Sequence, residues 1–178
     1  MSEIADLDAI STARLVSSGE ISASEAVSAA FRRIEERKEL NAFITLCEER
    51  ARKEAGAADA ARKRGDEMRP LHGVPFSVKD LTNTEGVPTS QGSALFAGKV
   101  PDADAIAVAR ARATGAILIG KTTTPEFGHK PFTEGPYFGR TLNPWDHGRT
   151  CGGSSGGGAV AVATGMGALA LGSDGGGS

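Results

Sequence analysis

The chain has 178 residues, 39% of them hydrophobic and 24% charged, which is typical of a folded globular domain or of part of a larger one. Its net charge of −2 offers no basic surface for nucleic acid or an anionic membrane, and no apolar run approaches the roughly 20 residues of a membrane-spanning helix. The first residues, MSEIADLDAI, lack the basic and apolar regions of a signal peptide. We therefore expect a cytoplasmic protein with no membrane partner and no direct nucleic-acid partner.

Three helices are predicted in the first 65 residues. The first covers about 5–18 and ends before Gly19, with apolar side chains at helical spacing. These are Leu7, Ile10, Leu15 and Val16. The second begins at a capping box, Ser22 with Glu25 three residues later, and its apolar face carries Val27, Phe31 and Ile34. The third covers about 46–64 and is rich in alanine and charge, which is typical of a solvated helix face.

From about residue 66 short apolar runs alternate with helical patterns. Strands are predicted within 71–80, 116–121 and 168–174. Helices are predicted within 102–115, with an aspartate cap at the start and Gly115 after the end, and within 156–167. This alternation predicts an α/β core with a mixed, largely parallel sheet covered by helices. We expect 1–65 to form a helical layer on or beside that core, and 66–178 to form the first part of the core.

One segment matches the pattern of a phosphate-binding loop. Residues 115–122, GAILIGKT, satisfy G-x-x-x-x-G-K-[ST]. The four intermediate residues are Ala-Ile-Leu-Ile, which favour a strand, whereas in a phosphate-binding loop the strand precedes the first glycine and a helix follows the lysine. Pro125 follows shortly afterwards. We therefore reject nucleotide binding by this segment.

The segment 151–178, CGGSSGGGAVAVATGMGALALGSDGGGS, contains many of the chain's 24 glycines. A flexible Gly/Ser linker would be polar throughout, but AVAVATGMGALALG is apolar and must be buried. A dinucleotide-binding glycine loop would need a different spacing. In a hydrolase, by contrast, serines in glycine turns could act as nucleophiles. The amides of Gly175, Gly176 and Gly177 could then face one point and stabilise an oxyanion.

A serine nucleophile needs a base to take its proton. The three histidines, His72, His129 and His147, have no nearby partner that singles one out, and they have no metal-binding spacing with the two cysteines. A buried neutral lysine is the alternative base, because burial lowers the pKa of an ammonium group. Lys79 ends the apolar run VPFSVK, but composition alone does not separate it from Lys121.

Four segments together resemble the amidase signature family of amide hydrolases. In chain order they are GVPFSVKD, GKTTTPEFG, TLNPWD and GGSSGGG…ALGSDGGGS, and the resemblance extends over nearly the whole chain from about residue 7. Ser154 and Ser178 are 24 residues apart, the separation of the two catalytic serines in that family. The resemblance therefore implies that 1–178 is the N-terminal part of a single amidase domain and is incomplete for the fold.

The resemblance also implies a catalytic triad. Ser178 would attack the amide carbonyl, Ser154 would pass the proton onward from a cis peptide bond with Gly153, and neutral Lys79 would be the final base. In supporting roles, Ser155 would hydrogen-bond near Lys79 or cap the following helix, and Asp174 would orient the glycine turn. No metal and no organic cofactor is implied. Phe127, Gly128 and His129 are candidates for the substrate pocket.

Three functions remain open at this point. The first is a stand-alone amidase that converts a small-molecule amide to acid and ammonia or amine. The second is the glutaminase half of a glutamyl-tRNA amidotransferase, its A subunit, with partner subunits, and the third is a non-catalytic binding protein on the same scaffold. The motifs SVKDL and GSDGGGS favour the stand-alone enzyme, for which a homodimer is compatible.

Overall fold

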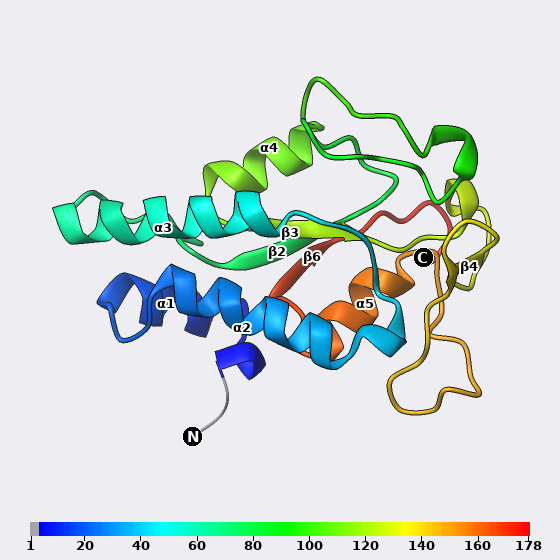
Figure 1. Cartoon of the computed structure of the whole chain (residues 1–178), viewed down its shortest axis with the longest axis horizontal. Helices are drawn as coiled ribbons and strands as arrows, with labels where there is room; N and C mark the ends of the chain where they lie inside the picture. Colours follow the sequence, from blue (N-terminus) through cyan, green and yellow to red (C-terminus); the bar gives the residue numbers. More distant parts are fainter. Residues whose placement is uncertain (1–3) are drawn as a thin grey trace.

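The computed structural model describes residues 4–178, and its centre is a four-stranded sheet in the order β1-β3-β2-β6. The strands are β1 Phe43–Leu46, β2 Pro75–Lys79, β3 Ile117–Thr122 and β6 Leu169–Leu171. Strand β2 runs parallel to both β3 and β6, whereas β1 pairs antiparallel with β3. The predicted α/β fold with a mixed, largely parallel sheet is therefore confirmed (Figure 1).

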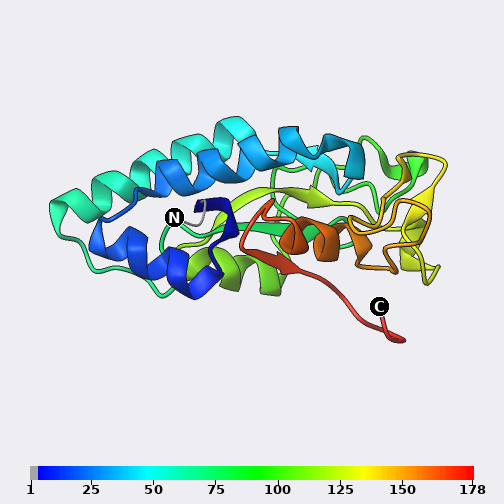
Figure 2. The same ribbon diagram turned by 90° about the horizontal axis from the view of Figure 1, so that it is seen from below.

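Helices surround this sheet, and a short hairpin lies beyond one of its ends (Figure 1). The α-helices are α1 Ala9–Ser18, α2 Ala23–Glu36, α3 Glu48–Arg64, α4 Ile106–Ala113 and α5 Gly156–Ala163. The hairpin strands are β4 Glu134–Gly135 and β5 Gly139–Arg140, and 3-10 turns span Ile4–Asp6, Lys38–Leu40, Ala94–Phe96 and Glu126–Gly128. After β6 the chain runs away from the helices as an extended segment (Figure 2). Among residues 4–178, no helix has the length and apolar character needed to cross a membrane.

The predicted capping box forms at the start of α2. The Ser22 hydroxyl accepts from the Glu25 amide at 3.0 Å, and the Glu25 carboxylate accepts from the Ser22 amide at 2.7 Å. Helix α1 starts later than predicted, because the Asp8 side chain accepts from the Ser11 amide at 2.8 Å and so sets the first turn. Ile10, expected on the apolar face of α1, is 79% exposed.

Residues 43–46 correct the prediction for the N-terminal layer. They form the antiparallel edge strand β1, and α3 consequently starts at Glu48 rather than at 46. The strand is four residues long and only half buried, so it carries no periodic apolar signal. It exists because its backbone pairs with β3, with Thr45 opposite Lys121.

The predicted aspartate cap of α4 is wrong. Ala105 occupies the N-cap position and offers no side-chain hydrogen bond. Asp104 instead accepts from the Glu85 amide at 2.7 Å and pairs with Arg112 at 3.4 Å, so it ties the preceding loop to the helix. Gly115 follows the helix as predicted, with a φ of +88° that favours glycine.

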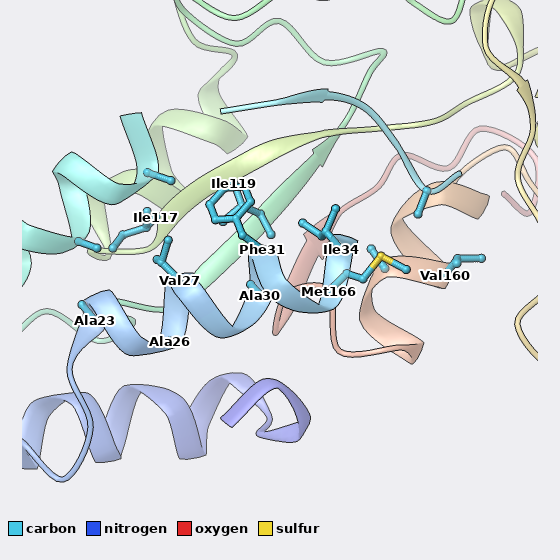
Figure 3. Packing of buried hydrophobic residues seen from close by; sticks show 14 of the residues in the cluster. Ala23, Ala26, Val27, Ala30, Phe31, Ile34, Ile117, Ile119, Val160 and Met166 are labelled. Atoms are coloured by element: carbon cyan, nitrogen blue, oxygen red, sulfur yellow. The ribbon is translucent and has the colours of Figure 1, made fainter. Parts of the chain in front are cut away.

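Two apolar clusters cover the opposite faces of the sheet. On one face α2 packs against β3 and α5, and Figure 3 shows this contact. Val27 and Phe31 of α2 belong to that cluster together with Ile119 of β3. On the other face Phe76 and Val78 of β2 pack with Leu118 and with Val108 of α4. The alternation of β2 therefore directs Ser77 and Lys79 toward the α5 face.

Candidate active site

Lys79 is the last residue of β2 and its side chain is 1% exposed. Its ammonium donates to the hydroxyls of Ser154 at 2.7 Å and Ser155 at 3.0 Å, and to the Ser173 carbonyl at 3.2 Å. Lys79 and Ser173 lie at the carboxyl ends of β2 and β6, which meet at one edge of a parallel sheet. The structure therefore brings together the predicted base and the predicted relay serine.

The surroundings of Lys79 shift the pKa of its ammonium group. Burial lowers the pKa of the Lys79 ammonium below its ordinary value, while the Asp174 carboxylate acts in the opposite direction. Burial disfavours the charged form because an ion in a poorly solvated site loses its hydration. The neutral amine, which is the form that can accept a proton, is therefore easier to reach than for an exposed lysine.

Ser154 lies in a tightly packed turn immediately before α5, and its peptide bond with Gly153 is cis. A side chain at Gly153 would meet the backbone of Phe132 at 2.9 Å. Thr133 holds the turn from outside, since its hydroxyl donates to the Gly152 carbonyl at 2.9 Å and accepts from the Gly156 amide at 3.1 Å. Ser154 itself is 2% exposed. The turn thus presents its hydroxyl inward to Lys79.

Ser155 had two open interpretations, and its contacts separate them. It is the N-cap residue of α5, but its side chain makes no capping hydrogen bond. Its hydroxyl instead accepts from Lys79 and donates to the Ser173 carbonyl at 3.1 Å or the Ser178 carbonyl at 3.1 Å. Ser155 therefore links Lys79 to the segment that carries Ser178.

Asp174 organises the glycine turn, as the sequence predicted. One of its carboxylate oxygens, Oδ1, accepts from the amides of Gly176 at 2.9 Å, Gly177 at 2.5 Å and Ser178 at 3.0 Å. These hydrogen bonds lower the pKa of the Asp174 carboxyl, because they stabilise its charged form. Three amides of this turn thus converge on one anionic oxygen. They include the amide of Ser178, which the sequence prediction omitted, but not that of Gly175.

Ser178 borders the same site, and in this conformation its hydroxyl bonds to a backbone carbonyl. Ser178 Oγ donates to the Ser173 carbonyl at 3.1 Å. That carbonyl therefore accepts hydrogen bonds from Lys79, Ser155 and Ser178. The importance of Ser173 was missed, because a backbone carbonyl leaves no mark in the residue type.

The structure distinguishes Lys79 from Lys121, which composition could not. Phe76 pairs with Leu118 but Ser77 pairs with Gly120, so β3 holds one extra residue, Ile119. Without this bulge Lys121 would lie opposite Lys79 and on the same face. With it, Lys121 lies opposite Val78 and points to the other face. The bulged segment is a fully buried strand, as expected when the phosphate-loop interpretation was rejected.

A pocket of about 510 Å³ opens beside Lys79, Ser155 and Ser178. Its walls include Val162, Ala163, Ala170 and Leu171 and are largely apolar. Two further lining residues, Thr122 and Cys151, were not predicted. Thr122 follows from the β2–β3 register, since it pairs with Lys79. Cys151 immediately precedes the Gly152–Gly153 turn, and burial raises the pKa of its thiol.

A second pocket, of about 330 Å³, is also lined by Ser178. Gly128 and His129 line it together with Gly153 and the glycine turn, so two of the three predicted pocket residues are placed there. Phe127 instead packs edge-on against Phe96, with ring centroids 6.0 Å apart. Ser178 therefore borders both a largely apolar pocket and a more polar one.

Known proteins resemble this chain in sequence and in structure. A family profile described as Amidase matches residues 25–178. The chain is 44% identical to the indoleacetamide hydrolase of Bradyrhizobium diazoefficiens over 96% of its own length and 33% of that protein. It is 40% identical to the A subunit of the glutamyl-tRNA(Gln) amidotransferase of Streptomyces coelicolor over 100% of its own length and 36% of that protein.

Among solved structures, 6-aminohexanoate cyclic dimer hydrolase in complex with substrate superposes with a TM-score of 0.84 at 37% identity. That match covers 93% of this chain and 33% of the hydrolase. The chain thus spans about a third of the length of the relatives it matches. Since the family profile covers most of its residues, the chain belongs to the amidase (amidase signature) family of amide hydrolases.

Proposed function

We propose that the protein hydrolyses a carboxylic amide through an acyl-serine intermediate, with Ser178 as nucleophile, Ser154 as proton relay and Lys79 as base. The observation that carries the proposal is the 2.7 Å contact between Lys79 Nζ and Ser154 Oγ, buried beside the pocket that Ser178 lines. The lowered pKa of Lys79 supports the same roles, because a neutral amine can accept the serine proton.

The reaction would proceed in two balanced stages. In the first, Ser178 Oγ bonds to the amide carbonyl carbon, its proton passes to Ser154 Oγ, and the Ser154 proton passes to Lys79 Nζ. Collapse of the tetrahedral intermediate breaks the C–N bond, and the leaving nitrogen takes a proton back along the relay. In the second, water attacks the acyl ester by the same route and releases the acid. Ser178 Oγ must first exchange the Ser173 carbonyl for Ser154 as its hydrogen-bond acceptor.

The glycine turn would stabilise the tetrahedral oxyanion. The amides of Gly176, Gly177 and Ser178 already converge on a carboxylate oxygen, which supports their ability to bind an anionic oxygen. A contribution from Gly175 stays a prediction from the sequence. For the turn to act on substrate, these amides must be shared between Asp174 and the substrate oxygen.

Substitution of Ser178 tests the proposal. We expect Ser178→Ala in the whole protein to lower turnover of small amides by roughly four orders of magnitude. Ser11→Ala is the matched control and should retain activity, because the half-buried Ser11 hydroxyl donates to Asp8 at the start of α1. A serine-directed fluorophosphonate should label the wild type but not Ser178→Ala. Full turnover in Ser178→Ala would exclude the nucleophile, and absence of both turnover and labelling in the wild type would favour the non-catalytic binding protein.

The glutaminase half of an amidotransferase is the second candidate, because the chain is 40% identical over its whole length to such a protein. Both candidates use the same triad, so they differ in substrate and partners. A panel of aliphatic, aryl and cyclic amides together with glutamine separates them. Glutamine hydrolysis that depends on a co-purifying partner protein would favour the amidotransferase.

A further inference from the structure

Lys79 and Asp80 are adjacent in the chain but point to opposite faces of the sheet. Lys79 contacts the serines, whereas Asp80 lies on the face of α4, where its nearest cation is Lys121, with 3.6 Å between Oδ1 and Nζ. Both side chains of this pair are 0% exposed. The mechanism proposed above uses neither of them. A buried ion pair is expensive to form, since each charge loses its hydration, so its presence next to the base requires an explanation.

The Asp80 carboxylate holds the loop that follows β2. Its Oδ2 accepts from the Ser90 amide at 3.0 Å, the Ser90 hydroxyl at 2.6 Å and the Gly92 amide at 3.3 Å. Lys121 holds the same loop from β3, donating to the Thr82 carbonyl at 2.7 Å and the Thr89 hydroxyl at 2.8 Å. The pair therefore fastens both ends of residues 82–92 to the strand ends.

This loop connects directly to the wall beside Ser154. The Gln91 amide donates to the Asp80 carbonyl at 3.1 Å, and the Gln91 carbonyl accepts from the Phe127 amide at 2.9 Å. Gln91 and Phe127 both have left-handed backbones, with φ of 57° and 55°. A side chain on the next residue, Gly128, would lie 3.4 Å from Ser154 Oγ. Left-handed backbones at non-glycine residues persist only where their surroundings hold them.

We propose that Asp80, paired with Lys121, is a positioning residue. It holds the loop 82–92, and Gln91 of that loop in turn holds the Phe127–Gly128 turn. Lys79 and Ser154 thereby stay in hydrogen-bond contact and shielded from water. This proposal rests on the proposed amidase mechanism. The pair acts from the opposite face of the sheet and touches neither serine. A carboxylate is required at position 80 because one of its oxygens, Oδ2, accepts three hydrogen bonds, and Lys121 balances its charge.

A charge-balanced double variant separates positioning from electrostatics. Asp80→Asn alone leaves a buried lysine without its counter-ion, whereas Asp80→Asn with Lys121→Met removes both charges at similar volume. Asp80 faces Lys121 most closely, with Asp104 and the Cys47 thiol further away, and Asp174 faces Lys79. The matched control is Glu48→Gln with Arg52→Met, an ion pair within α3 whose residues lie outside the loop 82–92.

In the whole protein, the double variant at 80 and 121 is expected to lower kcat at least about tenfold, because small displacements of a catalytic group are costly, while KM changes less than about threefold. Water entering around Lys79 should raise the pKa of its amine, measured by NMR titration of the lysine side chain. The control pair should keep kcat within about twofold of wild type. Wild-type kcat together with an unchanged Lys79 pKa in the folded double variant overturns the proposal.

Two further outcomes are decided by the same set of measurements. If the wild type hydrolyses no amide, the proposed function fails, and the Lys79 titration alone decides whether Asp80 positions it. If the double variant does not fold, Ser90→Ala takes its place, since it removes only the 2.6 Å hydroxyl contact to Asp80. A lower kcat with a raised Lys79 pKa in Ser90→Ala supports positioning, and no change in either contradicts it.

Discussion

The chemistry of this protein depends on how individual side chains are solvated. Lys79 and Lys121 have the same functional group at the ends of neighbouring strands, but their partners differ. Lys79 donates to two serine hydroxyls and a carbonyl, whereas Lys121 donates to a carbonyl and a threonine hydroxyl and also faces the Asp80 carboxylate. Burial lowers the pKa of Lys121 to about 8, and Asp80 opposes that shift. The pKa is lowered at both lysines, so the contact with the serine hydroxyls is what makes Lys79 the candidate base.

The pH dependence of the rate follows from the lowered pKa of Lys79. Only neutral Lys79 accepts a proton, so kcat/KM should fall as the pH drops through its pKa, which lies below the ordinary lysine value of 10.5. The pH–rate profile on an amide should show an acid limb with a lowered pKa, and Lys79→Ala should abolish most turnover. A rate independent of pH from acidic to alkaline conditions would contradict the role of Lys79.

Asp174 provides a second prediction at the residue scale. Asp174→Ala removes the acceptor of three amides, so the glycine turn should lose its shape and kcat should fall at least about tenfold. Asp146→Ala is the matched control, since Asp146 is an exposed aspartate that accepts from the Gly148 amide at 2.9 Å in another turn. Equal rates for both variants would show that Asp174 has no special role.

Among the secondary-structure elements, β3 determines which lysine enters the site. Its bulge at Ile119 turns Lys121 away from Lys79, and Gly120 makes the bulge compatible with β1. A side chain at Gly120 would lie 2.4 Å from the Thr45 carbonyl, closer than any real contact. The edge strand and the active site are therefore coupled through one glycine.

Gly120→Ala tests this coupling. We expect it to destabilise the fold by about 2 kcal/mol or more, because backbone atoms of β1 must move. Gly56→Ala is the control, since Gly56 lies within α3 with nothing near its missing side chain, and it should stabilise the fold by up to ~1 kcal/mol. Chemical denaturation of both variants measures the difference. A neutral Gly120→Ala would mean that β1 adapts freely.

For the molecule as a whole, we expect the N-terminal helices to stabilise the core and to take no part in the chemistry. Val27 is 0% exposed and lies in the cluster that joins α2 to β3, far in the sequence from the serines. The layer and the sheet bury their apolar surfaces against each other (Figure 3). A substitution in this cluster should therefore change the free energy of unfolding without changing the turnover of the folded protein.

Val27→Ala should lower the free energy of unfolding by about 2 kcal/mol through lost burial and a residual cavity. Turnover per folded molecule should stay unchanged. Ile10→Ala, which removes a side chain 79% exposed on α1, should change stability by less than about 0.5 kcal/mol. Thermal unfolding and activity at matched folded concentration measure both effects. A loss of kcat in folded Val27→Ala would contradict this separation.

Local sequence alone determined much of this protein. The capping box of α2, the buried strand at 117–122 and the helix after the serine turn all depend on neighbouring residues, so their patterns were sufficient. The four segments that resemble the amidase signature family likewise indicated Lys79, Ser154, Ser155 and Asp174 as candidate site residues before any contact was known. The contacts then joined Lys79 to both serines and Asp174 to the glycine turn.

Only the tertiary structure decided the remaining features. Strand β1 forms because its backbone pairs with β3. Asp104 does not cap α4, because its carboxylate accepts from the Glu85 amide and pairs with Arg112. The choice between Lys79 and Lys121 depends on a one-residue shift in register. Each of these outcomes is set by groups distant in sequence, and a single-residue shift reverses which face of a sheet a side chain meets.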